Sequence, residues 1–185
     1  MSKLLSSQFS LIWEEITNKA QLENNCEPIL SNYFEANIFP FENLRQGLSS
    51  KLEKDLAGAG LKQPVLANLI AESEDNTSLV TDAAADIQAT LDRDSACNSP
   101  LEVFLFYKGF IALQVHRIGN AFYNNGDVDL SLYLQMRVSE VFSIDIHPGA
   151  TIGKGIMFDH AHNLVIGETA EVGDNVSILH AVTLG

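Results

Sequence analysis

Histidines and carboxylates that could do chemistry gather in the last quarter of the chain. His160 directly follows Asp159, and Asp145 lies fifteen positions before His160. Removing the proton of a hydroxyl nucleophile at neutral pH needs a base, and histidine, with an ordinary pKa of about 6.5, is the usual one. A carboxylate beside the base selects its tautomer and stabilises the imidazolium that forms. These residue types suit base catalysis on a hydroxyl group, although their spacing alone does not establish a contact.

The same region allows a second interpretation as a metal site. His147, His160, His162 and Asp159 all carry side chains that bind zinc in proteins. Zinc held in this way would activate a water molecule for attack. Which interpretation holds depends on the elements that position these side chains.

The elements from Asp145 onward follow a six-residue period. One apolar residue recurs on this beat, with a two-residue shift at Leu164-Val165: Ile146, Ile152, Phe158, Ile166, Val172, Ile178 and Leu184. Glycine directly follows four of these seven residues. Such a beat fits neither the 3.6-residue period of a helix nor the two-residue period of a strand, and it predicts a parallel β-helix. Two ordinary strands of an α+β domain are the alternative.

The first part of the chain has helical periodicity instead. Apolar side chains recur every three or four residues, as at Ile29, Leu30, Tyr33 and Phe34, and again along 44–56. We therefore predict two domains, a helical one at 1–142 and a β-helical one at 143–185. The apolar stripes predict a helical core, and none of them resembles a cofactor-binding motif.

One of these helices has a clear start and end. Ser99-Pro100-Leu101-Glu102 has the pattern of a capping box with proline at the first helical position. The apolar stripe continues from there through Tyr107 and Phe122, and the loop Asn124-Asn125-Gly126-Asp127 ends it. We therefore expect a single helix between these two signals, with His116 as a structural residue on it.

The composition argues against several functional classes. The 185-residue chain has a net charge of −13, which disfavours nucleic acid and anionic membranes as partners. Its two cysteines, Cys26 and Cys97, are too few for a disulfide framework and have no metal-ligand spacing. No apolar run is long enough to cross a bilayer, and the N-terminus lacks the pattern of a signal peptide. We expect a cytoplasmic protein.

Several sequence motifs lie between Asp92 and Gly185. They are Tyr107-Lys108-Gly109-Phe110, Gln114-Val115-His116-Arg117, Asp145-Ile146-His147-Pro148, Asp159-His160-Ala161 and Ile166-Gly167-Glu168-Thr169-Ala170. In this order, behind a helical domain, they resemble the motifs of serine O-acetyltransferases, a family of hexapeptide-repeat acyltransferases. The residues before Asp92 fit that family in length and helical character only.

The resemblance implies both a fold and an activity. The fold is α+β, an all-helical N-terminal domain followed by the first coils of a left-handed parallel β-helix. The family transfers acetyl from acetyl-CoA, its co-substrate, to the hydroxyl of L-serine and so makes O-acetylserine for cysteine biosynthesis. It uses no metal, and L-cysteine is a possible feedback inhibitor. Its β-helices form trimers with active sites between subunits, and two trimers commonly join through their helical domains.

The resemblance also assigns roles to four residues. His160 corresponds to the general base and Asp145 to the carboxylate that orients it. Asp94 and Asp159 correspond to the carboxylates that bind the serine ammonium group through charge-assisted hydrogen bonds. Asp145 and His160 are fifteen positions apart, close to one coil of three hexapeptides, so the fold could place them on neighbouring coils, although spacing alone does not prove a contact. The residues that contact CoA are unknown.

The sequence departs from the family pattern beside two of these residues. Ser95 stands where proline is usual, which puts the rigidity of the Asp94 loop in doubt. His162 and Asn163 stand where threonine and glycine are usual, which puts the shape of the turn after His160 in doubt.

The chain stops at Gly185, where the family usually continues into further coils. Stacked repeats usually need three or more units, and Lys154 is the only basic side chain after Arg137 to meet the CoA phosphates. We therefore expect an incomplete acyl-donor site and impaired activity. Docking of the family's C-terminal tail into O-acetylserine sulfhydrylase is expected only for a full-length chain.

Two alternative functions follow from the same residues. The chain could be a regulatory or scaffolding partner of O-acetylserine sulfhydrylase rather than an enzyme. It could also be a zinc enzyme that resembles γ-class carbonic anhydrase, which holds zinc with histidines between β-helical subunits. The long helical domain argues against the zinc enzyme, because that class lacks it.

Overall fold

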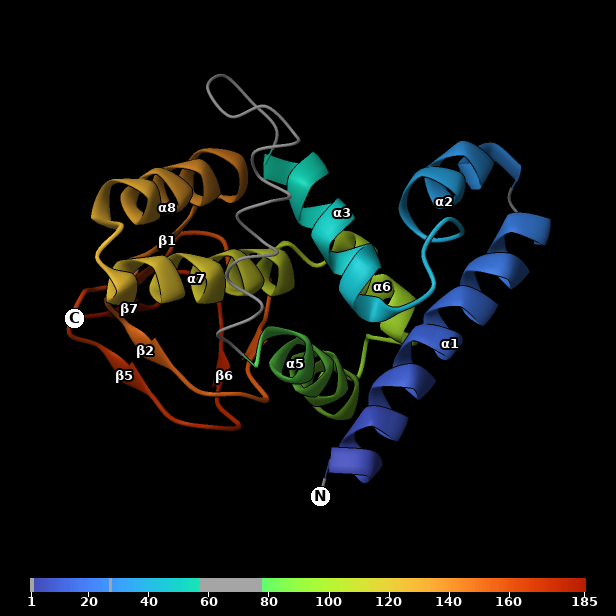
Figure 1. Cartoon of the computed structure of the whole chain (residues 1–185), viewed down its shortest axis with the longest axis horizontal. Coiled ribbons are helices and arrows are strands. Elements are labelled where there is room, and N and C mark those ends of the chain that lie inside the picture. Colours follow the sequence, from blue (N-terminus) through green and yellow to red (C-terminus); the bar gives the residue numbers. More distant parts are fainter. Residues whose placement is uncertain (1, 27, 57–77) are drawn as a thin grey trace.

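The computed structural model describes residues 2–26, 28–56 and 78–185, and their side chains from residue 11 onward. The helices are α1 (Ser2–Cys26), η1 (Pro28–Leu30, a 3₁₀ helix), α2 (Ser31–Asn37), α3 (Leu44–Leu56), α5 (Leu79–Arg93), α6 (Pro100–Phe106), α7 (Lys108–Asn125) and α8 (Val128–Phe142). The strands are β1 (Ile144–Ile146), β2 (Thr151–Ile152), β3 (Met157–Phe158), β4 (Leu164–Ile166), β5 (Glu171–Val172), β6 (Ser177–Ile178) and β7 (Thr183–Leu184). The strands lie at the lower left of Figure 1 with α7 and α8 above them, and α1, α2, α3 and α6 lie to the right. None of the described helices is long and apolar enough to cross a membrane.

The predicted signals for helix ends are confirmed. The Ser99 hydroxyl accepts a hydrogen bond from the Glu102 N–H at 3.4 Å, and Pro100 occupies the first turn of α6. Gly126 ends α7 with a φ of 95°, a left-handed conformation that glycine adopts without the steric cost a side chain would add.

The prediction of one helix between these signals is wrong at Tyr107. Its backbone is extended, with φ −88° and ψ 99°, and this residue separates α6 from α7. The break redirects the chain so that α7 can lie along the strands. Periodicity did not reveal it, because both helices bury apolar residues at similar spacing on either side of the break.

The helical part of the core lies between α1, α3, α5 and α6. Its most buried large side chains include Ile16, Leu48 and Phe104, and Trp13 meets the Phe104 ring edge-on at 5.4 Å between centroids. One predicted core residue, Ile29, is instead 86% exposed. It lies in η1, where three residues complete a turn and the 3.6-residue stripe no longer applies.

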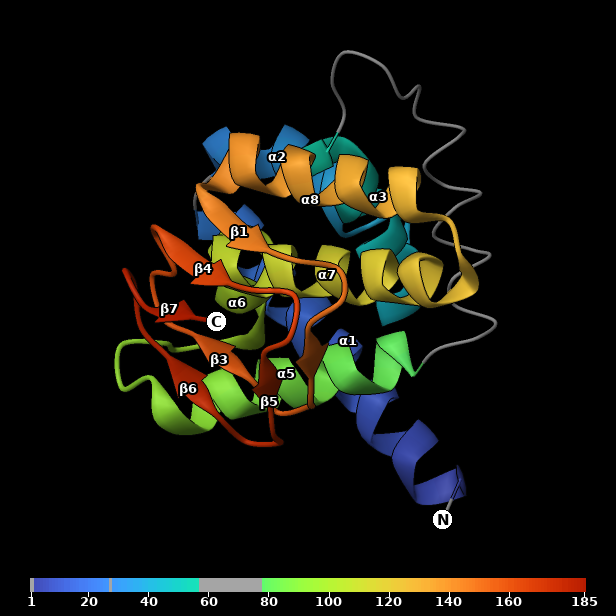
Figure 2. The ribbon, with the colours of Figure 1, turned by 90° about the vertical axis from the view of Figure 1, so that its left-hand side faces the viewer.

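The strands form two stacked coils of a parallel β-helix. The first coil pairs with the second in three separate sheets, with Ile144 opposite Leu164, Thr151 opposite Glu171 and Met157 opposite Ser177. β7 extends the first sheet to the order β1-β4-β7. Figure 2 shows these strands side by side, with α7 and α8 beside the first coil.

All seven residues of the six-residue beat lie in strands. Five are buried (Ile146, Phe158, Ile166, Val172 and Ile178), and Ile152 and Leu184 are partly buried. The position predicted for the two-residue shift is wrong, since Leu164 and Val165 belong to β4 and pair with β1 in register. The two extra residues lie instead in the turn 159–163: eight positions separate Phe158 from Ile166, but only six separate Ile178 from Leu184.

Helix α7 lies along the edge of the first coil that does not pair with the second coil. Arg117 donates to the carbonyl oxygens of Ile152 and Gly153, at 3.3 and 2.8 Å. One turn further on, the Asn120 amide donates to the carbonyls of Pro148 and Ala150, at 2.8 and 3.2 Å. These bonds satisfy main-chain groups that would otherwise be left unpaired at a sheet edge. The helices and the first coil therefore share one interface.

Candidate active site

His160 lies in the turn 159–163, between β3 and β4. His160, Ala161 and Asn163 have positive φ values of 53°, 53° and 56°. A side chain in this left-handed region costs of the order of 1 to 3 kcal/mol unless it can bond locally, and such strain is frequent at functional sites. The main chain holds the turn in place, because Asn163 donates to the Ser143 carbonyl and Ala181 donates to that of His162, at 2.9 and 2.8 Å.

The His160 side chain is 77% exposed and lies beside Asp159. Its Nε2 is 3.7 Å from Oδ1 of Asp159, and its ring centroid is 6.0 Å from that of His180 on the next coil. The turn thus presents an accessible imidazole next to a carboxylate. The sequence placed Asp159 and His160 in one site, and the structure brings them together.

Asp145 is half-buried on β1, where its Oδ1 accepts a hydrogen bond from Gln135 Nε2 of α8 at 2.6 Å. The residue beside Asp145 on the next coil is Val165, so the suggested placement of Asp145 and His160 on neighbouring coils is wrong. Twenty positions separate Asp145 from Val165, so His160, fifteen positions after Asp145, still belongs to the first coil. Across the described ranges, no hydrogen bond or ion pair joins Asp145 to His160, and the pair stays a prediction.

Asp94 is the C-terminal cap of α5 and lies half-buried. Its Oδ1 accepts from the Ala96 N–H at 2.9 Å, and its Oδ2 accepts from the Tyr107 hydroxyl at 3.1 Å. Ser95, where the family usually has proline, therefore lies in a loop that the Asp94 carboxylate itself closes. This local bond is of the kind that aspartate side chains form in turns.

The first turn of α7 packs against the turn of His160. A Cβ on Gly109 would lie 2.6 Å from the Phe158 carbonyl oxygen and 3.1 Å from the Ala161 Cβ, so only glycine fits there without displacement of the main chain. The Lys108 ammonium donates to the Phe142 carbonyl at 3.1 Å and is 3.3 Å from His162 Nδ1. The Lys-Gly-Phe motif therefore positions the turn.

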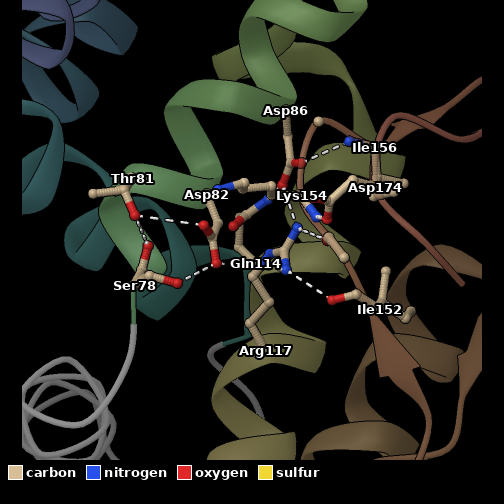
Figure 3. A network of polar contacts seen from close by, with 12 residues as sticks. Ser78, Thr81, Asp82, Asp86, Gln114, Arg117, Ile152, Lys154, Ile156 and Asp174 are labelled. Atoms are coloured by element: carbon tan, nitrogen blue, oxygen red, sulfur yellow. Dashed lines mark hydrogen bonds and ion pairs between the residues drawn. The ribbon is translucent and has the colours of Figure 1, made fainter. Parts of the chain in front are cut away.

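A buried polar network connects α5 and α7 to the first coil (Figure 3). Asp86 is 1% exposed, and its Oδ2 accepts from Arg117 Nη2 at 2.8 Å and from Gln114 Nε2 at 3.0 Å. Its Oδ1 accepts from the Ile156 N–H at 2.8 Å. Burial raises the pKa of Asp86, and the Arg117 charge and the hydrogen bonds oppose that rise. The sequence analysis missed this network, although three polar residues inside apolar helical stripes were a signal for it.

The remaining predicted residues fall outside this arrangement. His116 is 7% exposed, and burial, together with the charge of Arg117, lowers its pKa to about 3, so it is a neutral structural residue as expected. His147 Nδ1 accepts from the Gly149 N–H at 3.1 Å within its own turn. In the part of the chain that the structure describes, no three histidine, cysteine, aspartate or glutamate side chains are close enough together to hold a metal ion.

Comparison with known proteins places this architecture in a family. A family model described as serine acetyltransferase, N-terminal, matches residues 12–115. The chloroplastic serine acetyltransferase 1 of Arabidopsis thaliana is 44% identical over 175 residues, which are 94% of this chain and 56% of that protein. The chain therefore spans little more than half the length of this relative.

Solved structures agree with the sequence comparison. A soybean serine acetyltransferase complexed with serine has a TM-score of 0.91 and 40% identity, over 95% of this chain and 73% of that one. The Brucella abortus enzyme in complex with coenzyme A has a TM-score of 0.91 and 36% identity, over 96% and 71%. A serine acetyltransferase in complex with cysteine has a TM-score of 0.89 and 40% identity, over 93% and 72%. The predicted fold, helices followed by coils of a left-handed β-helix, is confirmed. The chain belongs to the serine acetyltransferase family.

Proposed function

We propose that the protein transfers the acetyl group of acetyl-CoA to the hydroxyl of L-serine, giving O-acetylserine for cysteine biosynthesis. The observation that carries this proposal is the exposed His160 imidazole beside Asp159, on a strained turn of a chain of this family. Family members have been solved with serine and with coenzyme A, which supports the choice of the two substrates.

His160 acts in this proposal as the general base. Its neutral imidazole takes the proton of the serine hydroxyl while the hydroxyl oxygen attacks the thioester carbonyl carbon. The C–S bond then breaks, and the imidazolium returns the proton to the CoA thiolate. General base catalysis of this kind contributes about 10²- to 10⁴-fold in rate.

Asp94 and Asp159 bind the serine ammonium group in this proposal. The support is stronger for Asp159 than for Asp94, since the Asp159 side chain is 30% exposed and lies beside the proposed base, His160. Asp145 orients His160 in the assembled enzyme. Gln135 occupies its Oδ1, which leaves Oδ2 to accept the imidazole N–H.

Release of free thiol from acetyl-CoA on adding L-serine tests the proposal. We expect release from the unmodified chain and a loss of about 10²- to 10⁴-fold in the His160→Ala variant. His162→Gln is the matched control, since it removes an exposed histidine of the same turn and should keep most of the activity. Serine-dependent release that survives in His160→Ala would contradict the proposal. Failure of the folded chain to bind L-serine would contradict it as well, whereas L-serine binding without thiol release would agree with the incomplete acyl-donor site expected from the sequence.

The proposed assembly is a homotrimer, or a dimer of trimers, in which 1–142 serves assembly and 143–185 contributes to the active site. Exposed apolar side chains support an interface on α8 and the coils: Leu132, Met136, Val141, Val165 and Leu179 are between 38% and 52% exposed. Light scattering should give three or six times the mass of one chain.

L-cysteine is the proposed inhibitor, and it should compete with L-serine in the thiol-release assay.

A further inference from the structure

The break between α6 and α7 places one side chain against Asp94, a candidate substrate-binding residue. Tyr107 is the single extended residue between the two helices, and its hydroxyl donates to Oδ2 of Asp94 at 3.1 Å. Burial raises the pKa of the Tyr107 phenol, and its neighbours Cys97 and Asp94 raise it further. The phenol therefore stays protonated and remains a donor across the physiological pH range.

The main chain on either side of this contact is fixed to the β-helix. Arg93, which precedes Asp94, donates to the Gly155 carbonyl at 2.9 Å and to the Ser177 hydroxyl at 3.1 Å, and so joins both coils. Gly109, two residues after Tyr107, packs directly on the turn of His160. Tyr107 thus bridges the loop that carries Asp94 and the helix that supports the turn of His160.

The chemistry of the groups that donate to Asp94 matters as much as their position. Both partners of the Asp94 carboxylate, the Tyr107 hydroxyl and the Ala96 N–H, are neutral donors. Among the described residues, no cation pairs with Asp94. The bonds to Asp94 therefore bring no positive charge to its carboxylate, and each of its oxygens keeps a lone pair for a further donor.

We propose that Tyr107 is a positioning residue that holds Asp94 in place to receive the ammonium group of the amino-acid substrate. This inference rests on the proposed function. A phenol is suited to the task, because it orients the carboxylate without neutralising it. An arginine or lysine in its place would compete with the ammonium group of the substrate.

Calorimetric titration of L-serine into the unmodified chain and into Tyr107→Phe tests this role. The variant keeps the ring and removes only the hydroxyl, and we expect L-serine to bind about 3- to 10-fold more weakly. In the thiol-release assay KM for L-serine should rise by the same factor, while kcat and KM for acetyl-CoA stay unchanged. Tyr123→Phe is the matched control, because the Tyr123 hydroxyl also donates to a carboxylate, that of Glu168, at 2.9 Å. Tyr123 lies near the end of α7 opposite to Tyr107.

A double-mutant cycle separates positioning from general stability. If Tyr107 acts through Asp94, Tyr107→Phe should have no further effect on L-serine binding in an Asp94→Asn background. Equal losses in both backgrounds would mean that the hydroxyl only stabilises the fold, and would overturn the inference. Unchanged binding by Tyr107→Phe would overturn it as well, with the proposed function intact. Failure of the folded, unmodified chain to bind L-serine would overturn the proposed function, and this inference with it.

Discussion

Two aspartates eight residues apart, Asp86 on α5 and Asp94 at its C-terminal cap, have opposite surroundings in the fold. Asp86 is buried, and it is paired with the Arg117 guanidinium and two further donors. Asp94 is half-buried at the end of the helix, and its donors are neutral. Asp86 connects the helices to the β-helix, and Asp94 connects the end of α5 to the residue between α6 and α7. Asp86 does so with its charge compensated inside the protein, whereas Asp94 has its charge still available.

This difference separates stability from binding within one helix. A buried carboxylate with all its hydrogen bonds made inside the protein has no capacity left for a ligand, and removing it leaves a buried cation unpaired. A carboxylate held by neutral donors contributes less to the fold and can attract a cationic group. The same contrast applies to the histidines, since His116 is buried in the interface and His160 is exposed on the turn.

The largest effect is expected from Asp86→Ala. This change leaves Arg117 with the longer contact to Asp82, at 3.9 Å, as its carboxylate partner and removes the acceptor of the Ile156 N–H. It should lower the free energy of unfolding by about 3 kcal/mol. Urea denaturation followed by circular dichroism measures this change. Glu23→Ala is the control: it breaks the Lys19–Glu23 pair, in which both side chains are 39% exposed, and should cost less than about 1 kcal/mol. A similar loss of unfolding free energy in the two variants would show that the buried Asp86 matters no more for stability than an exposed ion pair.

A pH-dependent effect is expected at His116. Its pKa is lowered from 6.5 to about 3 in the folded protein, so the unfolded chain binds a proton below pH 6.5 that the folded chain does not. The stability contributed by the neutral form is therefore present above pH 6.5 and is lost as the pH falls towards 3. The loss between pH 7 and pH 4 should be about 3 kcal/mol.

Urea denaturation across this pH range measures the loss at His116. The His116→Gln variant, which cannot take up the proton, should show a shallower decline in stability by about that amount. Parallel curves for the two proteins would show that His116 is not buried in its neutral form.

A smaller effect, on catalysis rather than stability, is expected from Gln135→Met. Without the amide, Asp145 loses the bond that orients its carboxylate, and kcat should fall about tenfold, or about 1.4 kcal/mol, while KM for L-serine is unchanged. The Gln88–Asp92 pair on α5 is a matched glutamine–carboxylate contact at 2.8 Å, and Gln88→Met should leave kcat unaffected. A change in KM without a change in kcat would assign Gln135 to binding instead.

The smallest effect on stability is expected from His160→Ala. An exposed side chain on a turn contributes little to the core, so the free energy of unfolding should change by less than about 0.5 kcal/mol. The same variant should lose nearly all activity in the thiol-release assay. Thermal denaturation checks the expectation for stability. A loss of stability as large as that of Asp86→Ala would contradict the view that buried polar residues stabilise the fold and exposed ones serve the site.

Much of the fold follows from local sequence patterns. The six-residue beat at residues 146–184 predicted the strands, and the capping signals at Ser99 and Gly126 predicted helix ends, because these features depend on residues close together in the chain. The break at Tyr107 was missed because it depends on distant partners, Asp94 and the turn of His160. The position of the two extra residues was missed because strand register, and not the apolar beat alone, determines which residues form the turn.

The sequence by itself determined the residue types of the candidate site, the period of the β-helix and the helical character of the described residues before the first strand. Only the tertiary structure decided which of these residues meet. It bonded Tyr107 to Asp94 and Gln135 to Asp145, and it enclosed Asp86 with Arg117. Such contacts join positions up to tens of residues apart, and they depend on how helices lie against coils. Local patterns encode the elements themselves, but the contacts between elements arise only when the shared core has packed.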